Sequence, residues 1–260
     1  MNQRVGIVVP TLGNRPDYLE KCLSSIRAAG EAHILLVAPD TFNSDSLSSA
    51  GLVDSVVFDK GSGLAAAINQ GIRALPSTVE FVNWLGDDDL LTTNSLVASS
   101  KALDENDQTV MAFGPCDYID GEGQTVWANT SGQWAVPLLR FGPDLIPQPG
   151  ALFRRSAFDK VGGLRTDLGW AFDFDLFIRL SKVGKLRFIN KTLAKFRWHP
   201  ESLSVEHRKK SVAEASQVRV SHLPAYLKPI SFIWEYPVQQ ATLIAGKRVT
   251  AKSKSKAKTK

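Results

Sequence analysis

Three consecutive carboxylates, Asp87 to Asp89, form the segment of this sequence best suited to chemistry. They follow an apolar stretch, Val79 to Leu85, and precede a polar stretch that can begin a helix. Adjacent carboxylates repel one another, and they lower this repulsion by facing water or by binding a cation. In open α/β sheets, ligands bind at the carboxyl ends of strands. This position favours a divalent metal with oxygen ligands, while a turn or a helix cap is the plainer alternative.

Three further polar residues follow in the second half of the chain. Asp173 and Asp175 stand at the start of a predicted helix, where a carboxylate can simply cap the backbone. An aspartate that faces a binding site can instead deprotonate a hydroxyl nucleophile. His199 comes after an aromatic-rich strand, and this placement suits a structural role as well as a metal or phosphate contact.

Several other chemistries find little support. Gly61 and Gly63 lack the full GxGxxG spacing, and no P-loop or GxSxG motif is present. The two cysteines, Cys22 and Cys116, supply neither a disulfide framework nor zinc-ligand spacing. Because Cys22 lies on the apolar face of a predicted helix, we expect it to be a buried thiol.

Strand and helix patterns alternate in the first hundred residues. Buried strands are predicted at 5–9, 34–37, 56–58 and 81–85, and helices begin near Pro16, Leu64 and Asn94. This alternation predicts a doubly wound, mostly parallel sheet flanked by helices.

The second half of the chain has a more varied pattern. Residues 110–113 and 125–127 flank an Asp120-Gly121 turn and are predicted to pair as a hairpin. Short strands are expected at 151–153, 186–189 and 192–198, and a helix over 176–183 should end at Gly184. Residues 211–246 are predicted to be helical in pieces, broken at Pro224, Pro229 and Pro237.

Composition places the chain among ordinary globular proteins. It has 260 residues, of which 43% are hydrophobic and 22% are charged, enough for one large domain with an appendage. No apolar stretch approaches the ~20 residues of a membrane span. The first strand starts at Val5 and leaves no room for a signal peptide, so we expect a cytoplasmic location.

The net charge of +5 comes from one end of the chain. Seven of the 31 basic residues lie between Lys247 and Lys260, and the remaining 24 are matched by 26 acidic residues. We therefore expect residues 247–260 to be a disordered basic tail. Such a tail is either a solvated terminus or a peripheral contact with an anionic membrane surface. Nucleic acid is not an expected partner, because the body carries no basic excess.

Taken together, these segments resemble the family 2 glycosyltransferases, which have the A-type glycosyltransferase fold. The resemblance covers 5–204, and its segments come in the family's order: Val5 to Arg15, Gly63 to Gly71, Phe81 to Asp89, Pro147 to Arg155 with Val161 to Leu164, Phe172 to Leu180 and Phe196 to Ser204. Each motif is short, and their order along the chain is what makes the resemblance specific.

The resemblance implies roles for individual residues. The predicted contacts of a nucleotide-diphosphate sugar donor are Pro10, Thr11, Leu12, Arg15, Asp40, Gly63, Ala66, Asp87 and Asp88. Asp87, Asp89 and His199 would hold Mg²⁺ or Mn²⁺. Asp173 would be the general base for the acceptor hydroxyl, and Trp170 and Asp175 would contact the acceptor.

The resulting hypothesis is a metal-dependent inverting glycosyltransferase of hexosyl or deoxyhexosyl specificity. It would move a sugar to a saccharide or lipid-linked acceptor in surface glycan synthesis. We expect a glycosyltransferase domain over 1–205, with a nucleotide-binding half (1–105) and an acceptor half (106–205), and a helical C-terminal extension over 206–246. The alternatives are a non-catalytic nucleotide-sugar-binding protein and a nucleotidyltransferase on a similar sheet.

Overall fold

The computed structural model of the chain describes residues 3–129, 131–198 and 207–258. Its larger sheet contains β1 (Val5–Pro10), β2 (His33–Ala38), β3 (Ser55–Phe58), β4 (Phe81–Trp84), β6 (Thr109–Phe113), β9 (Leu152–Arg154) and β10 (Lys185–Phe188). Its smaller sheet contains β5 (Leu90–Leu91), β7 (Cys116–Ile119), β8 (Thr125–Asn129) and β11 (Ala194–Arg197).

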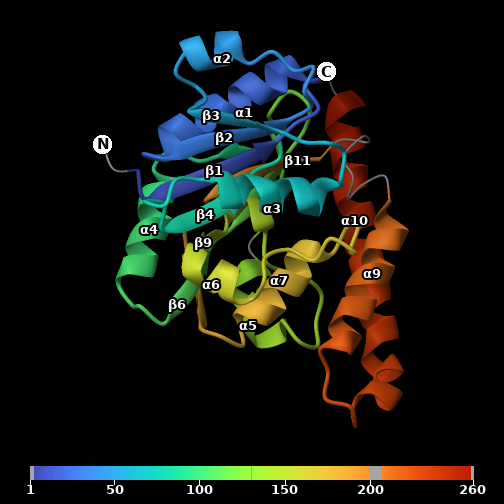
Figure 1. Ribbon diagram of the computed structural model, residues 1–260. Helices are drawn as coiled ribbons and strands as arrows, with labels where there is room; N and C mark the ends of the chain where they lie inside the picture. The colour runs from blue at the N-terminus through green and yellow to red at the C-terminus, as the bar shows by residue number, and fades with distance from the viewer. Residues whose placement is uncertain (1–2, 130, 199–206, 259–260) are drawn as a thin grey trace.

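The helices surround the larger sheet and extend beyond it. They are α1 (Pro16–Ala29), α2 (Asp45–Ser49), α3 (Leu64–Ala74), α4 (Ser95–Asp104), α5 (Ala135–Leu138), α6 (Arg155–Lys160), α7 (Phe172–Leu180), α9 (Arg208–Ser221) and α10 (Phe232–Lys258). Within the described residues, short 3₁₀ helices cover Ser131–Trp134, Gln148–Gly150 and Lys228–Ile230. Figure 1 shows α9 and α10 side by side at one flank of the molecule.

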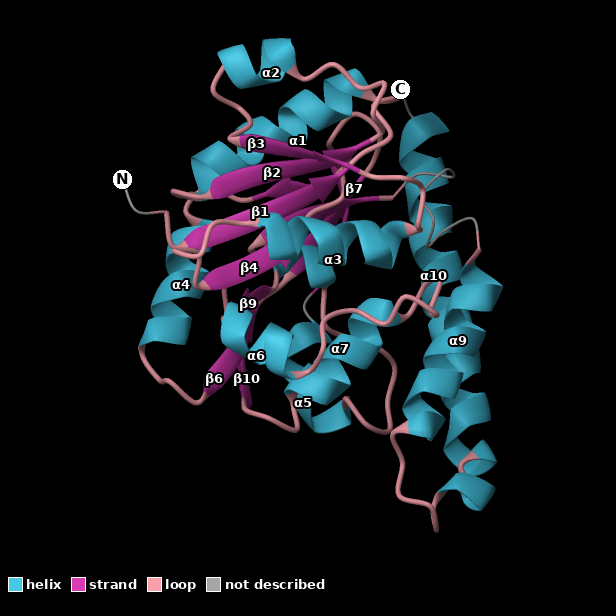
Figure 2. Cartoon of the chain, in the orientation of Figure 1, coloured by secondary structure: helices cyan, strands magenta, loops and turns pink. Residues whose placement is uncertain are grey.

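The strand order of the larger sheet is β10-β6-β9-β4-β1-β2-β3. Among these strands β9 alone runs antiparallel to its neighbours, β4 and β6. The expected mixed, mostly parallel sheet flanked by helices is therefore confirmed, together with the helical C-terminal extension (Figure 2). The carboxyl ends of β1, β2 and β4 meet at one edge of the sheet.

Two hydrophobic cores explain why the central strands are continuously apolar. Along β1, Val8 faces the core shared with α3 and α7, whereas Ile7 and Val9 face the core shared with α1 and α4. A strand that is covered on both faces needs apolar side chains at every position. Cys22 lies in the second core as a buried free thiol, as we expected.

The predicted hairpin is wrong in one strand. Strand β6 lies inside the larger sheet between β9 and β10, and the partner of β8 is β7, in which Tyr118 lies opposite Trp127. Gly114 and Pro115 separate β6 from β7, so the chain leaves one sheet and enters the other within two residues. The turn itself is where we placed it, and the Asp120 carboxylate accepts the backbone N–H groups of Glu122 and Gln124.

The C-terminal helix is longer than the sequence predicts. Helix α10 contains Pro237 without a break and continues to Lys258, through the segment that we expected to be disordered. Pro237 is the sixth residue of the helix, so the helix continues past it with one backbone hydrogen bond fewer. The Ala and Lys residues that follow are good helix formers. The division of residues 1–205 into two functional halves stays a prediction.

One close helix–sheet contact generates a test of this packing. A side chain at Gly71 of α3 would place its Cβ 2.5 Å from Val8 of β1 and 2.8 Å from Val37 of β2. Gly71→Ala should therefore lower the free energy of unfolding by about 1–3 kcal/mol in urea denaturation. Arg73→Ala on the exposed face of α3 is the control and should change it by less than about 0.5 kcal/mol. A stabilised Gly71→Ala protein would contradict the packing, because alanine is otherwise the better helix residue.

Candidate functional site

The acidic run lies just past β4, beside the end of β1. The Thr11 hydroxyl donates to Asp87 Oδ2 over 2.7 Å, which ties the two strand ends together. Arg15 bridges two carboxylates, donating through Nη2 to Asp87 Oδ1 (2.7 Å) and through Nη1 to Asp88 Oδ2 (2.6 Å). One guanidinium thus brings positive charge to two adjacent acids, as a bound cation would. Burial raises the pKa of Asp87, and these hydrogen bonds oppose that rise.

Asp89 turns away from this pair. Its Oδ1 accepts the backbone N–H of Arg197 in β11 over 2.9 Å, and its side chain is buried. Arg197 in turn donates through Nε to the Asp88 carbonyl and through Nη1 to the carbonyls of Asp120 and Gly121. Burial raises the pKa of Asp89 well above its ordinary value. Asp89 therefore joins the two sheets through one of its two carboxylate oxygens, and its predicted role as a metal ligand stays a prediction.

Asp87 and Asp88 fit a hard divalent cation. They offer carboxylate oxygens on consecutive residues, and Arg15 already holds these oxygens around one positive group. Mg²⁺-type sites commonly use one or two carboxylates and complete their shell with substrate phosphates and water. Within the described ranges, no three His, Cys, Asp or Glu side chains gather into a complete metal site. His199, the third predicted ligand, lies outside the described residues.

The other predicted donor residues lie at the carboxyl edge of the larger sheet. They are Pro10 at the end of β1, the exposed Leu12 after it, the exposed Asp40 after β2, and Gly63 and Ala66 at the start of α3. Asn69, further along the same helix, has a different task. Its side chain donates to the Leu164 carbonyl and accepts the Leu164 N–H, so it anchors the loop that leads to α7.

Asp173 lies in the first turn of α7, next to the end of β4. Phe172 contacts Trp84, the last residue of β4, with ring centroids 6.2 Å apart. Removal from bulk water raises the pKa of Asp173 from 3.8 to about 6, although its Oδ1 accepts the Phe174 N–H. The negative charge of Glu214 raises this pKa further. A carboxyl group with this pKa is ionised at neutral pH and is a stronger base than an ordinary aspartate.

Glu214, a residue that sequence reasoning missed, fixes the beginning of α7. Its carboxylate accepts the backbone N–H groups of Gly169 (3.0 Å), Trp170 (2.7 Å) and Ala171 (2.7 Å). It reaches them from α9, much further along the chain. Three unpaired N–H groups before a helix attract a carboxylate. No local sequence signal marks Glu214, because its partners come together only in the folded chain.

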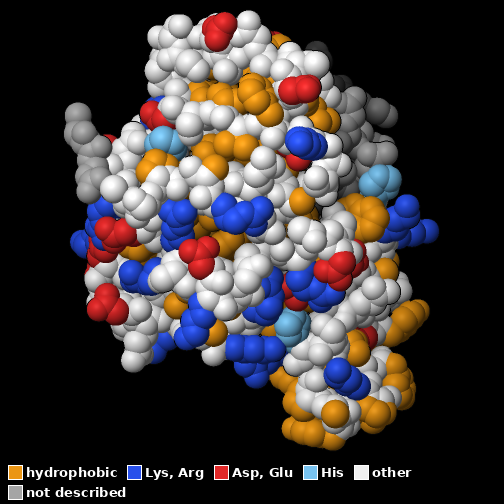
Figure 3. Space-filling view, viewed as in Figure 1, with side chains coloured by type: hydrophobic (Ala, Val, Ile, Leu, Met, Phe, Trp, Pro, Cys, Tyr) orange, Lys and Arg blue, Asp and Glu red, His pale blue; other side chains and the backbone are white. Residues whose placement is uncertain are grey.

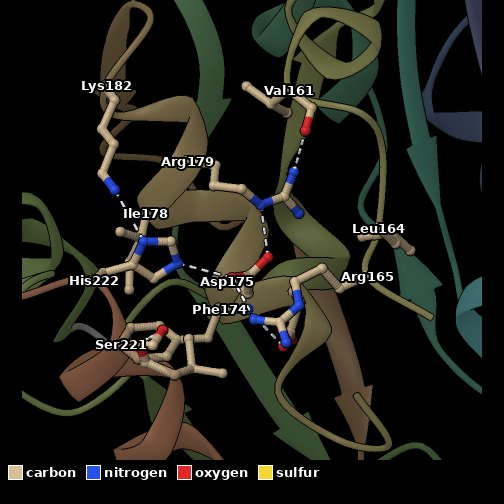
Figure 4. A network of polar contacts seen from close by, with 12 residues as sticks. Val161, Leu164, Arg165, Phe174, Asp175, Ile178, Arg179, Lys182, Ser221 and His222 are labelled. Atoms are coloured by element: carbon tan, nitrogen blue, oxygen red, sulfur yellow. Dashed lines mark hydrogen bonds and ion pairs between the residues drawn. The ribbon is translucent and has the colours of Figure 1, made fainter. Parts of the chain in front are cut away.

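The structure does not place Asp175 where an acceptor could reach it. Its side chain is fully buried, Oδ2 accepts Arg179 Nε at 2.6 Å, and Oδ1 lies 2.8 Å from His222 Nε2 (Figure 4). Arg165 adds a longer contact of 3.7 Å. Burial would raise the pKa of Asp175, but the bonds from His222 and Arg179 outweigh it and lower the pKa. Asp175 therefore joins α7 to α9, where His222 follows the last helical residue.

The tryptophans divide between core and surface. Trp84 is buried and stacks on Phe153 with centroids 5.6 Å apart, so it is a core residue. Trp170 is partly exposed, and its ring contacts His207 and lies beneath Lys210 of α9. It lies two residues before the start of α7, and its predicted acceptor contact stays a prediction.

Comparison with known proteins gives named relatives. No protein-family model matches the chain. An uncharacterized glycosyltransferase of Rickettsia conorii (strain ATCC VR-613 / Malish 7) is 23% identical over 213 residues, covering 76% of this chain and 34% of the relative. One of Rickettsia typhi (strain ATCC VR-144 / Wilmington) is 22% identical over 206 residues, covering 75% and 64%. The chain thus spans about a third of the first relative's length.

Solved structures share the fold. A mannosyltransferase from Pyrobaculum calidifontis, in complex with GDP-Man and Mn²⁺, has a TM-score of 0.65 at 16% identity, covering 98% of this chain and 79% of that one. TarS from S. aureus has a TM-score of 0.61 at 14% identity, covering 87% and 68%. GalNAc-T7 with UDP, GalNAc and Mn²⁺ has a TM-score of 0.58 at 16% identity, covering 87% and 53%. The chain therefore has the A-type glycosyltransferase fold.

The environment of Asp173 can be tested without an assay. Carbon-detected NMR titration of its carboxyl group should give a pKa of about 6. Glu214→Gln removes a neighbouring negative charge and should lower this pKa. Glu105→Gln, in a residue exposed at the end of α4, is the charge-matched control and should leave it unchanged. The same Asp173 pKa in wild type and Glu214→Gln would show that Glu214 does not act on Asp173.

Proposed function

We propose that the chain is a metal-dependent inverting glycosyltransferase of family 2. It transfers a hexosyl or deoxyhexosyl group from a nucleotide-diphosphate sugar to a hydroxyl of a saccharide or lipid-linked acceptor, in the synthesis of a surface glycan. The relatives named glycosyltransferases and the shared fold support the general activity. The single observation that carries the proposal is the contact of Trp84, which precedes the Asp87–Asp88 carboxylates, with Phe172, the neighbour of Asp173.

The donor would lie along the carboxyl edge of β1, β2 and β4. Pro10, Thr11 and Leu12 border this edge at β1, and Asp40 borders it at β2, where a base or ribose would lie. Arg15 is partly exposed and contacts both acidic residues, and this supports a role for its guanidinium beside the proposed diphosphate. The solved mannosyltransferase and GalNAc-T7 complexes, which contain nucleotides or nucleotide sugars with Mn²⁺, support a donor of this class.

Asp87 and Asp88 would hold Mg²⁺ or Mn²⁺, with diphosphate oxygens completing the shell. When bound, the ion supplies positive charge that stabilises the departing nucleoside diphosphate. Asp88 is the more accessible of the two, with 13% of its side chain exposed. We replace Asp89 by Asp88 in the predicted ligand set, because Asp89 is committed to the Arg197 backbone.

Asp173 would accept the proton of the acceptor hydroxyl as that oxygen attacks the anomeric carbon. The attack comes from the face opposite the diphosphate, so the new C–O bond forms as the old one breaks and the configuration inverts. The bonding electrons of the broken bond leave on the diphosphate, where Arg15 offers a cation. The pKa of about 6 suits this role, because Asp173 is ionised at pH 7 and still basic enough to share a proton.

Asp173→Asn should separate catalysis from binding. The amide cannot accept the proton, and we expect transfer to fall by at least about a thousandfold, while the donor affinity measured by calorimetry changes less than about threefold. In the wild type, kcat/KM should rise with pH through about 6, because only the ionised carboxylate acts as the base. Near-normal turnover of the variant would refute the assignment of the base.

Asp88→Asn and Asp89→Asn should differ in their Mn²⁺-dependent binding of nucleotides. Asp88→Asn should weaken Mn²⁺-dependent binding of UDP or GDP at least about tenfold with little loss of stability. Asp89→Asn keeps an acceptor oxygen for the Arg197 N–H and should retain that binding, whereas Asp89→Ala leaves the N–H unpaired and should cost about 1–3 kcal/mol of stability. Loss of Mn²⁺ binding in Asp89→Asn, with normal binding in Asp88→Asn, would reverse our assignment.

A further inference from the structure

Towards its tip, the hairpin of α9 and α10 has a cluster of polar residues between its helices and large apolar residues on its outer side. Between the two helices, Arg219 donates to both Glu235 oxygens (2.7 and 2.8 Å), and Ser216 donates to Glu235 Oε2 (2.6 Å) and accepts from Gln239 (3.0 Å). Arg219, Ser216 and Glu235 are buried. A helix that faces water normally has the reverse arrangement, with its apolar face inside. The exposed apolar residues of this part of the hairpin are therefore suited to an apolar surrounding.

Large apolar side chains cover the outer side of the hairpin's tip. The tip runs from Tyr226 to Tyr236, and its strongly exposed residues are Tyr226 (77%), Phe232 (69%), Tyr236 (67%) and Ile233 (61%). Figure 3 shows hydrophobic side chains gathered on this end of the molecule, with Lys and Arg side chains near it. Contiguous exposed patches of this kind mark protein–protein or membrane contacts rather than ordinary surface.

The charges around the tip distinguish between a protein partner and a membrane. From Arg208 to Lys252 the sequence has only two acidic residues, Glu214 and Glu235. Both have partners within the structure: Glu214 accepts backbone N–H groups before α7, and Glu235 is paired with Arg219. The exposed charged residues of the hairpin are basic, among them Lys228 within the tip and Lys247 and Arg248 on α10. A second copy of this positive surface would be repelled, whereas an anionic surface would be attracted.

We propose that the tip of the α9–α10 hairpin inserts its aromatic and aliphatic side chains into the headgroup region of an anionic lipid bilayer. Amphipathic aromatic rings favour the boundary between headgroups and acyl chains, and nearby lysines add attraction to anionic lipids. The contact is peripheral, since no described helix combines the length and apolar character needed to cross a bilayer. The tip differs from the Lys-rich C-terminal segment, for which the sequence left both a solvated terminus and a membrane contact open.

Glu214 and His222 link this tip to the site, because both belong to the segment that forms the first arm of the hairpin. Glu214 accepts backbone N–H groups of the residues before α7, and His222 hydrogen-bonds to Asp175 of α7. Docking of the tip would thereby hold the molecule on the membrane through the same helix that positions Asp173.

Flotation of the full chain with vesicles tests the proposal. The wild type should float with vesicles of phosphatidylcholine containing about 30% phosphatidylglycerol, and only weakly with phosphatidylcholine alone. The triple variant Phe232→Ser, Ile233→Ser, Tyr236→Ser should reduce binding at least about tenfold. The control is Phe58→Ser with Val97→Ser, which removes exposed apolar residues elsewhere and should bind like the wild type. Circular dichroism should show the same unfolding temperature for all three proteins.

Two further variants distinguish the tip from the Lys-rich C-terminal segment. Lys228→Glu should weaken binding to the anionic vesicles and should leave the weak binding to phosphatidylcholine vesicles unchanged. Deletion of residues 253–260 should leave most of the binding, and its complete loss on deletion would overturn the proposal in favour of the C-terminal segment. Wild type that stays unbound, or a triple variant that floats like the wild type, would also overturn it. The proposal would also be overturned if light scattering showed that the wild type is a dimer and the triple variant a monomer. The exposed face would then bind a second copy of the chain.

Discussion

The removal of three adjacent carboxylates from water is the constraint on which the rest of the site depends. Burial of an ionised group without a partner costs far more than a folded protein can spare. Each carboxylate in the run therefore has a partner: Thr11 and Arg15 for Asp87, the same Arg15 for Asp88, and the Arg197 backbone for Asp89. These partners come from the end of β1 and from the second sheet. The acidic run is thus a junction as well as a candidate binding site.

The second constraint is the placement of Asp173. Helix α7 begins where three backbone N–H groups are held by Glu214, and its buried Asp175 is held by Arg179 and His222. Both Glu214 and His222 come from the C-terminal extension. The position and basicity of the proposed catalytic carboxylate therefore depend on a segment that lies beyond the motifs of the glycosyltransferase resemblance. This dependence makes the extension part of the site's architecture.

Prediction from sequence succeeded where the signal was local and repeated. The apolar runs of β1, β2 and β4 and the helical faces between them predict the sheet, because strands buried on both faces must be apolar throughout. It failed where the outcome depends on distant partners. Strand β6 has the same apolar character as a hairpin strand, and its true neighbours, β9 and β10, lie far along the chain. Asp175 looked available beside Asp173, but its partner His222 lies outside every motif.

The central claim is that a nucleotide sugar and a divalent cation bind together at the Asp87–Asp88 pair. Thermal unfolding with a broad panel of nucleotide sugars, with and without Mn²⁺, tests this claim most directly. Binding to the native state raises the unfolding temperature. We predict that at least one nucleotide sugar stabilises the wild type in the presence of Mn²⁺, and that EDTA removes the effect. A panel in which no nucleotide sugar shifts the unfolding temperature, with or without the metal, would contradict the account.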